Sequence, residues 1–279
     1  MQWVLRLRVF IIIFLAVMLI SAAVIFSVLR AVLPYATGYK NEIQQEVGQL
    51  IGLPVEISSI DATIHWFSPR LKLLDVAVYD ENNKLTLFNF KEAFFELDVI
   101  SSILRGDFIV NDIGLVGADI AIEKLSDNEW LVQGIKFSGE GSSELPEKFL
   151  YMIQNADYLL HDSNISFQDH TGDKFKVSLL DVNVDVENNF NNHDIKLSVH
   201  LPEAYGGHLA VVANLSGDID SLDGDVYIEA QQLNLQQLNN KFKLFSQYKA
   251  DAVADLTLWA SLANNTIETL YAQFDASKL

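Results

Sequence analysis

From Val55 almost to the end of the chain, apolar side chains recur at every second position. In the clearest run, residues 180–187, aliphatic residues alternate with acidic or amide residues. Successive side chains of a β-strand point to opposite faces, so each such run forms one apolar face and one polar face. The pattern predicts a mainly β fold, a long antiparallel curled sheet of roughly a dozen strands with an apolar groove.

Few helices are expected beside this sheet. Strands are predicted early in the domain at 55–66, 70–79, 84–97 and 108–123. Short helices are predicted after residue 52 only at 98–105, 146–160 and 234–245. Such helices cannot cover a long sheet. Its apolar face must therefore pack against a second sheet, curl onto itself, or bind something that is not protein.

The stretch between Arg8 and Arg30 contains no charged residue and is long enough to cross a membrane. As a helix it would cover roughly 30 Å, the thickness of the hydrocarbon core. The alternative is a cleaved secretory signal with Ser21-Ala22-Ala23 at the cleavage site, but the stretch exceeds the roughly 7 to 15 apolar residues of such signals. Arg6 and Arg8 precede it, which places the N-terminus in the cytoplasm and exports the rest.

Four segments follow from these patterns. Ile43, Val47 and Leu50 recur at helical spacing between Pro34 and Gly52, which predicts an amphipathic helix where the chain leaves the membrane. The expected segments are a cytoplasmic tip at 1–8, a transmembrane helix at 9–30, the membrane-exit helix at 31–52, and the β-rich groove domain at 53–279 with an internal boundary near 139–145.

Charge and cysteine content exclude several classes of partner and site. All 37 acidic residues follow Arg30, and the formal net charge is −18. Such a surface repels nucleic acid and anionic membranes, so attachment to a membrane must depend on the apolar stretch. Since the chain has no cysteine, it forms neither disulfides nor thiolate metal sites.

No pattern typical of an active site stands out. Phosphate-loop, dinucleotide, nucleophile-elbow and zinc-protease motifs are absent from the sequence. The six histidines lack the spacing of metal ligands. Residues 218–229 loosely resemble a calcium loop, but Asp223 occupies the position that requires glycine, so a solvated turn is favoured. We expect a protein that is not an enzyme, with no cofactor and no metal.

Aromatic residues form a further candidate binding surface. They lie at Trp66-Phe67, Phe94-Phe95 and Trp130. A binding platform is one interpretation, but aromatic residues are also common in the cores of β proteins, and the core interpretation is favoured.

The N-terminal third has a distinctive order of features. The basic tip, the apolar stretch and the short helix are followed by the sequence Gly-Leu-Pro-Val-Glu-Ile-Ser-Ser-Ile-Asp-Ala at 52–62, and then by Trp66 and Ser68-Pro69-Arg70-Leu71. This order resembles the start of the YhdP family of AsmA-like envelope proteins of Gram-negative bacteria, best over residues 1 to about 125. Gly52, Pro54, Trp66 and Pro69 carry the motif. Family members are commonly several times longer, so a fragment or a short member is expected.

The resemblance implies an inner-membrane anchor and a periplasmic domain. In such proteins a curled sheet with an apolar lining is thought to carry phospholipids between the inner and outer membranes, which would maintain the outer-membrane permeability barrier. The implied partners are phospholipid, the inner membrane, and outer-membrane or periplasmic proteins. The helix at 36–51 would then lie where lipids enter.

The candidate groove residues share an aliphatic side chain at alternating strand positions. They are Val76, Val78, Leu85, Leu87, Val182, Val184, Val186, Ile195, Leu197, Val199, Val226, Ile228, Leu256 and Leu258. Exposing a sixteen-carbon lipid tail to water costs roughly 12 kcal/mol at ~0.8 kcal/mol per CH₂, which an apolar lining would largely offset. Alternatively, these residues face one another in a closed β-sandwich of a structural envelope protein that binds a protein partner. The sequence leaves both open.

Overall fold

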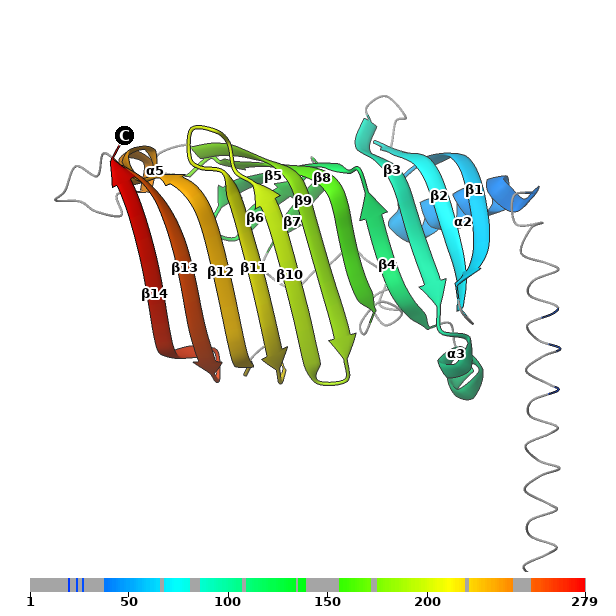
Figure 1. The fold of residues 1–279 in the computed structure, drawn as a ribbon. Coiled ribbons are helices and arrows are strands. Elements are labelled where there is room, and N and C mark those ends of the chain that lie inside the picture. Colours follow the sequence, from blue (N-terminus) through cyan, green and yellow to red (C-terminus); the bar gives the residue numbers. More distant parts are fainter. Residues whose placement is uncertain are drawn as a thin grey trace, which may run out of the picture.

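The computed structural model describes the chain at residues 20, 24, 27, 38–65, 68–80, 86–106, 109–133, 135–138, 156–171, 175–218, 221–242 and 252–278. Most of this part is one large sheet (Figure 1). Its strands are β1 (Val55–His65), β2 (Ser68–Tyr79), β3 (Thr86–Leu97), β4 (Val110–Val116), β5 (Asp119–Ser126), β6 (Glu129–Val132), β7 (Ile135–Ser138), β8 (Asp157–Asp169), β9 (Phe175–Asn189), β10 (Asn192–His200), β11 (His208–Ser216), β12 (Asp223–Asn234), β13 (Ala252–Ala263) and β14 (Thr266–Lys278). Helices are α2 (Lys40–Ile51), α3 (Val99–Arg105) and α5 (Leu235–Phe242).

The main path of the sheet runs in the order β1-β2-β3-β4-β8-β9-β10-β11-β12-β13-β14. A side branch of β5, β6 and β7 joins it through β8, and lies behind the main sheet in Figure 1. The strands β1 and β14 end the path without pairing with each other, so the curled sheet stays unclosed. The described strands therefore do not form the closed sandwich that the sequence allowed as an alternative.

Three sequence predictions about the elements are wrong in part. The sheet is not purely antiparallel, because β8 runs parallel to both β4 and β5; it returns to the path after an excursion through three other strands, and such a crossover permits parallel pairing. The predicted strand at 108–123 is two strands, since the chain turns at Gly117 with a φ of 66°. Of the predicted helix 146–160, the segment from Asp157 is strand β8, and 146–155 lies outside the described residues.

Irregular pairing contributes to the curl of the sheet. Asp162, Asp181 and Gln232 have φ angles of 48°, 48° and 54°, and each lies at a shift of strand register. The backbone N–H of Asp162 donates to Asn183 Oδ1 at 3.1 Å, and that of Gln232 donates to Asp255 Oδ1 at 2.7 Å. Such β-bulges bend the strand and increase its twist.

Two clusters close parts of the apolar face. One lies under α2 and contains Ile57 and Leu73 among its buried residues, with Ile43 and Val47 of α2 packed against it. The other lies under α5 at one end of β12 and β13, around Ala230, Leu233 and Ala254. Between these helices the described sheet has no helix packed on its apolar face.

The family-motif residues lie where α2 passes into β1. Gly52 ends α2 in the left-handed conformation with a φ of 77°, and its N–H donates to the Gly48 carbonyl at 2.9 Å. Next to it, the Pro54 carbonyl accepts a 2.8 Å hydrogen bond from the Tyr79 N–H. Pro69 pairs with Ile64 at the β1–β2 hairpin, and Trp66 lies outside the described residues.

The predicted membrane segments fall mostly outside the description. Of the transmembrane helix expected at 9–30, only Ile20, Val24 and Ser27 are described, and they are helical. No helix within the described ranges is both long enough and apolar enough to cross a bilayer. The expected tip at 1–8 and the boundary near 139–145 also lie outside the described residues.

Candidate apolar binding face

One face of the main sheet carries a continuous apolar row across all eleven strands of its path. Paired residues on neighbouring strands share a face, and the observed register links one aliphatic residue from each strand. This first apolar row consists of Ile60, Leu73, Ala93, Leu115, Leu160, Val184, Leu197, Val211, Ile228, Leu258 and Ala272. At the usual strand spacing its contour is about 48 Å long.

A second apolar row runs beside the first, two residues along each strand. It consists of Ala62, Leu71, Phe95, Ile113, Tyr158, Val186, Ile195, Ala213, Val226, Ala260 and Leu270. Neither row contains a charged residue, and the Tyr158 hydroxyl is the one polar side-chain group in both. The two rows together form what we call the apolar lane, which is two side chains wide along each strand.

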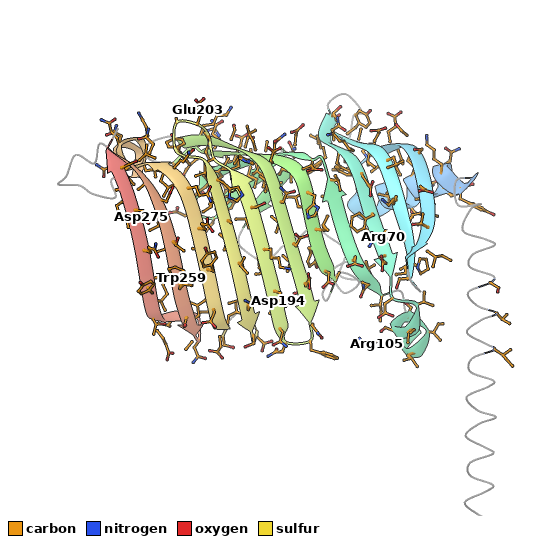
Figure 2. All side chains as sticks on the ribbon, viewed as in Figure 1. Arg70, Arg105, Asp194, Glu203, Trp259 and Asp275 are labelled. Carbon is orange, nitrogen blue, oxygen red and sulfur yellow. The ribbon has the colours of Figure 1, made fainter. Side chains whose placement is uncertain are left out.

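The opposite face carries the polar side chains of the sheet. One row on this face lies one residue beyond the second apolar row along each strand, and it contains Arg70, Glu96, Asp112, Asp157, Glu187, Asp194, Asn214, Asp225, Ser261 and Thr269. Arg70 pairs with Glu96 at 2.6 Å, but carboxylates dominate the rest of this row. Figure 2 shows Arg70, Asp194 and Trp259 on the side of the sheet that faces the viewer.

Exposure of the first apolar row changes along its length. At β1, β2 and β3 its residues are buried under α2, where Leu73 is only 2% exposed. From Leu115 on β4 to Leu258 on β13 every residue of the row is partly exposed. On β14 the lane is fully open, with Leu270 exposed to 61%. The described part of the protein therefore leaves most of the lane uncovered.

Polar contacts fix α2 over the covered end of the lane. The Gln44 Oε1 atom accepts a 3.1 Å hydrogen bond from the backbone N–H of Ile57. Lys40 Nζ donates to the Ser58 carbonyl at 3.0 Å. These bonds fix the helix to β1, and its apolar residues pack on the cluster to which β1, β2 and β3 contribute.

The predicted groove residues fall into three groups. On the two apolar rows lie Val184, Val186, Ile195, Leu197, Val226, Ile228 and Leu258. On the same face beside those rows lie Val182 and Val199, both buried, and Leu256, partly exposed. Val76 and Val78 instead lie in the closed cluster under α2. Leu87 is partly buried on β3, and Leu85 lies outside the described residues.

Sequence reasoning missed several residues of the lane, among them Leu115, Leu160 and Val211. On β11 the run Leu-Ala-Val-Val-Ala is apolar on both faces, so alternation does not mark one side. The pairing of Val211 with Leu197 and Ile228 shows that Val211 lies on the apolar face. The short run on β4 does alternate, and it could have been found within 110–116.

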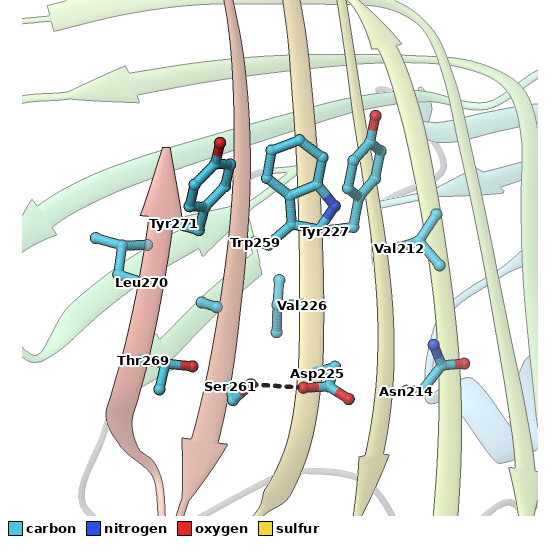
Figure 3. Close-up of a pocket in the computed structure, with 11 residues that line it drawn as sticks. Val212, Asn214, Asp225, Val226, Tyr227, Trp259, Ser261, Thr269, Leu270 and Tyr271 are labelled. Atoms are coloured by element: carbon cyan, nitrogen blue, oxygen red, sulfur yellow. Dashed lines mark hydrogen bonds between the residues drawn. The ribbon is translucent and has the colours of Figure 1, made fainter. Parts of the chain in front are cut away.

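An aromatic patch lies on the polar face, outside the apolar lane. Tyr227, Trp259 and Tyr271 are neighbours on three adjacent strands, with ring centroids 5.5 and 5.3 Å apart. They border a shallow hollow of about 390 Å³ (Figure 3). Beside it the Ser261 hydroxyl donates to Asp225 Oδ1 at 2.7 Å. The Tyr227 hydroxyl donates to Glu229 at 2.9 Å, and this hydrogen bond raises the pKa of Tyr227.

The aromatic residues singled out in the sequence lie elsewhere. Phe94 is buried, with the Arg70 guanidinium 4.6 Å from its ring centroid. Trp130 of the side branch packs near Phe167 of β8, and their ring centroids are 6.2 Å apart. The core interpretation therefore holds for Phe94, while Trp66-Phe67 lies outside the described residues.

No metal-binding cluster appears in the described ranges. Nowhere in them do three or more histidines and carboxylates gather as a metal site would require. Two of the histidines each pair with a single carboxylate: His161 Nε2 lies 2.8 Å from Asp185 Oδ1, and His170 Nε2 lies 2.7 Å from Glu123 Oε2.

Comparisons with known proteins identify one family and one similar protein. The family described as "YhdP protein" matches residues 1–279. A similar protein, "Intermembrane phospholipid transporter YhdP" from Escherichia coli (strain K12), is 25% identical over 224 residues. That alignment covers 79% of this chain but 17% of the relative, so the matched part spans less than a fifth of that protein.

Proposed function

Because this chain belongs to the YhdP family, we propose that it is a non-enzymatic conduit for phospholipids. In this proposal residues 9–30 anchor it in the inner membrane, and the sheet lies in the periplasm. Lipids move along the apolar lane toward the outer membrane, which maintains the permeability barrier there. The observation that carries the proposal is the uncharged first apolar row, which continues across eleven strands.

The lane addresses the main energetic obstacle to lipid movement. A sixteen-carbon tail in water costs roughly 12 kcal/mol at ~0.8 kcal/mol per CH₂. Aliphatic side chains replace water on one side of the tail, and the head group stays in solvent beyond the lane. Since each strand offers nearly the same apolar surface, a step from one strand to the next exchanges similar contacts. The free energy of a bound tail therefore has no deep minimum along the row.

The proposed lining is the two apolar rows from β4 to β13, with Leu256 beside them; Val182 and Val199 lie on the same face but are buried, so they support the lining from beneath. Val76 and Val78 are left out because α2 covers them. In this arrangement α2 roofs the end of the lane nearest the anchor, where lipids would be taken up. Outer-membrane or periplasmic proteins at the other end belong to the same proposal.

Two adjacent valines on β11 provide a matched test. Val211 pairs with Leu197 and Ile228 in the first apolar row, whereas Val212 pairs with Lys196 and Tyr227 on the polar face. A photo-cross-linking amino acid at position 211 should form phospholipid adducts in cells, and the same amino acid at position 212 should not. Mass spectrometry of the adducts reports the lipid.

Charge substitutions at Val211 and Val212 test whether the protein retains bound phospholipid. Val211→Asp places a carboxylate in the lane, so phospholipid that co-purifies with the detergent-solubilised chain should be lost. Val212→Asp adds the same charge on the polar face and should leave the bound lipid unchanged. Equal adducts at both positions, or equal lipid in both variants, would show that the apolar rows are not the lipid route.

A further inference from the structure

Helix α3 presents three large aliphatic side chains to solvent. Ile100, Ile103 and Leu104 are exposed to between 62% and 81%. Their spacing of three and four residues places them on one side of the helix. No residue of α3 is buried, so this apolar surface is not the edge of a core. Contiguous exposed apolar surface of this kind marks an interaction site.

The helix is held firmly although it is short. At its start Asp98 Oδ1 accepts a 2.9 Å hydrogen bond from the Ser101 N–H, and Asp98 Oδ2 accepts one of 2.6 Å from the Ser101 hydroxyl. At its end Gly106 has a φ of 70°, and its N–H donates to the Ser102 carbonyl at 2.9 Å. A helix of seven residues has little stability of its own, so these caps help to keep the segment that carries the apolar side chains helical.

A further contact ties α3 to the sheet. The Ile109 N–H donates to the Ser102 hydroxyl at 3.0 Å, and the Asp98 N–H donates to the Ile109 carbonyl at 3.0 Å. The helix therefore projects as a fixed element from the edge of the sheet between β3 and β4 (Figure 1). Arg105, at the end of α3, is labelled in this projecting position in Figure 2.

We propose that α3 docks the sheet on the membrane, with Ile100, Ile103 and Leu104 inserted among the lipid head groups. The surface has the chemistry of an interfacial helix, aliphatic with a basic residue at its end. Arg105 stands in its last turn, and α3 itself contains no acidic residue. The neighbouring carboxylate of Asp98 is turned to the caps. Asp98 and Asp107 flank the helix in the sequence, so the aliphatic side chains supply the main attraction to the bilayer, and Arg105 adds one contact to a lipid phosphate.

The proposal goes beyond the lipid route, but it rests on the proposed anchoring in the inner membrane. The β3–β4 edge belongs to the end of the sheet that also carries α2. A second membrane contact there would fix the orientation of the sheet relative to the bilayer, because attachment at a single point allows the sheet to rotate. The covered end of the lane would then be held at a constant orientation to the membrane.

The absence of cysteine allows a direct test with single labels. Leu104→Cys, carrying an environment-sensitive fluorophore, is reconstituted as the full chain in nanodiscs of zwitterionic and anionic phospholipid. Lipids that carry a nitroxide at the head group should reduce its emission strongly. The matched control is Phe190→Cys, which replaces a 99% exposed residue in the β9–β10 hairpin on the same edge of the sheet. Its emission should remain unchanged.

A second label at Ile100→Cys tests whether the result depends on one substituted position. Nitroxide lipid should quench this label as it quenches the label at Leu104→Cys. The measurement is repeated in the Val211→Asp background, in which docking should persist although lipid retention is lost. Equal emission with and without nitroxide lipid at both α3 positions would overturn the docking proposal. Adducts at position 211 would still support the lipid route, so the two proposals fail separately.

Discussion

Asp75 and Asp181 occupy equivalent places in β2 and β9. Each is the third residue of a Leu-Leu-Asp-Val segment, and their φ angles are 47° and 48°. Each is exposed and is followed by a buried valine, Val76 or Val182. Aspartate adopts the left-handed conformation more readily than most residues. The repeated segment therefore marks a point where the backbone of a long strand departs from regular pleating.

Substitution of Asp181 should separate backbone conformation from side-chain contact. Valine, a β-branched residue, is strained at this φ and should lower the free energy of unfolding by about 1–2 kcal/mol. Asp181→Gly relieves the strain, so its melting temperature should stay close to that of the natural chain. Thermal unfolding of the detergent-solubilised chain, followed by circular dichroism, measures both. Equal melting temperatures for the two variants would argue against strain at this position.

The closed and open parts of the lane should differ in their response to the same substitution. Leu73 is buried under α2, so Leu73→Ala should leave a cavity and cost about 2–5 kcal/mol. Leu197 lies in the same row but is partly exposed, so Leu197→Ala should cost less, about 1 kcal/mol. Denaturant unfolding of both variants provides the comparison. A loss as large at Leu197 as at Leu73 would mean that β10 is sealed as well.

The polar face should carry a measurable pH effect at Asp157. Burial raises the pKa of this carboxyl above its usual value of 3.8, against the hydrogen bond from the Asn188 N–H, which lowers it. The neighbouring carboxylates of Asp112 and Glu187 raise it further. The folded protein thus binds this proton more tightly than the unfolded chain. Ionised Asp157 consequently reduces stability as the pH rises through the raised pKa.

Asp157→Asn should therefore raise the melting temperature near neutral pH. An asparagine oxygen can still accept the 2.6 Å hydrogen bond from the Asn188 N–H, so the main change is the loss of charge. The difference from the natural chain should shrink as the pH falls below 3.8, where the carboxyl is protonated in both states. Melting curves over this range are the measurement, and a difference that does not vary with pH would contradict the assignment.

The elements were easier to predict than the way they pair. Alternation located β1, β2 and β3 to within a few residues and correctly favoured Val184 and Ile228 as members of one apolar face. It could not show that β8 returns beside β4, because that pairing joins residues more than 40 positions apart. Local sequence carries no signal for such a crossover, since the partner strand supplies half of the hydrogen bonds.

The candidate lining shows a similar limit of local pattern. Alternation states which residues share a face, but not what covers that face. Val78 and Val184 have the same pattern around them, yet Val78 lies under α2 and Val184 lies in the partly exposed lane. The β11 residues show the converse, because Val211 and Val212 are alike in sequence and only the register of their partners separates them.

The first apolar row contains one residue from each strand of the main path, so it is extended or interrupted one strand at a time. An added hairpin with the same alternation would lengthen it by about 10 Å, at ~4.8 Å per strand. A one-residue slip in any strand would turn that strand's contribution to the other face and break the row. The distance that such a surface can bridge is thus a count of strands in register, and evolution can adjust it without redesigning a binding pocket.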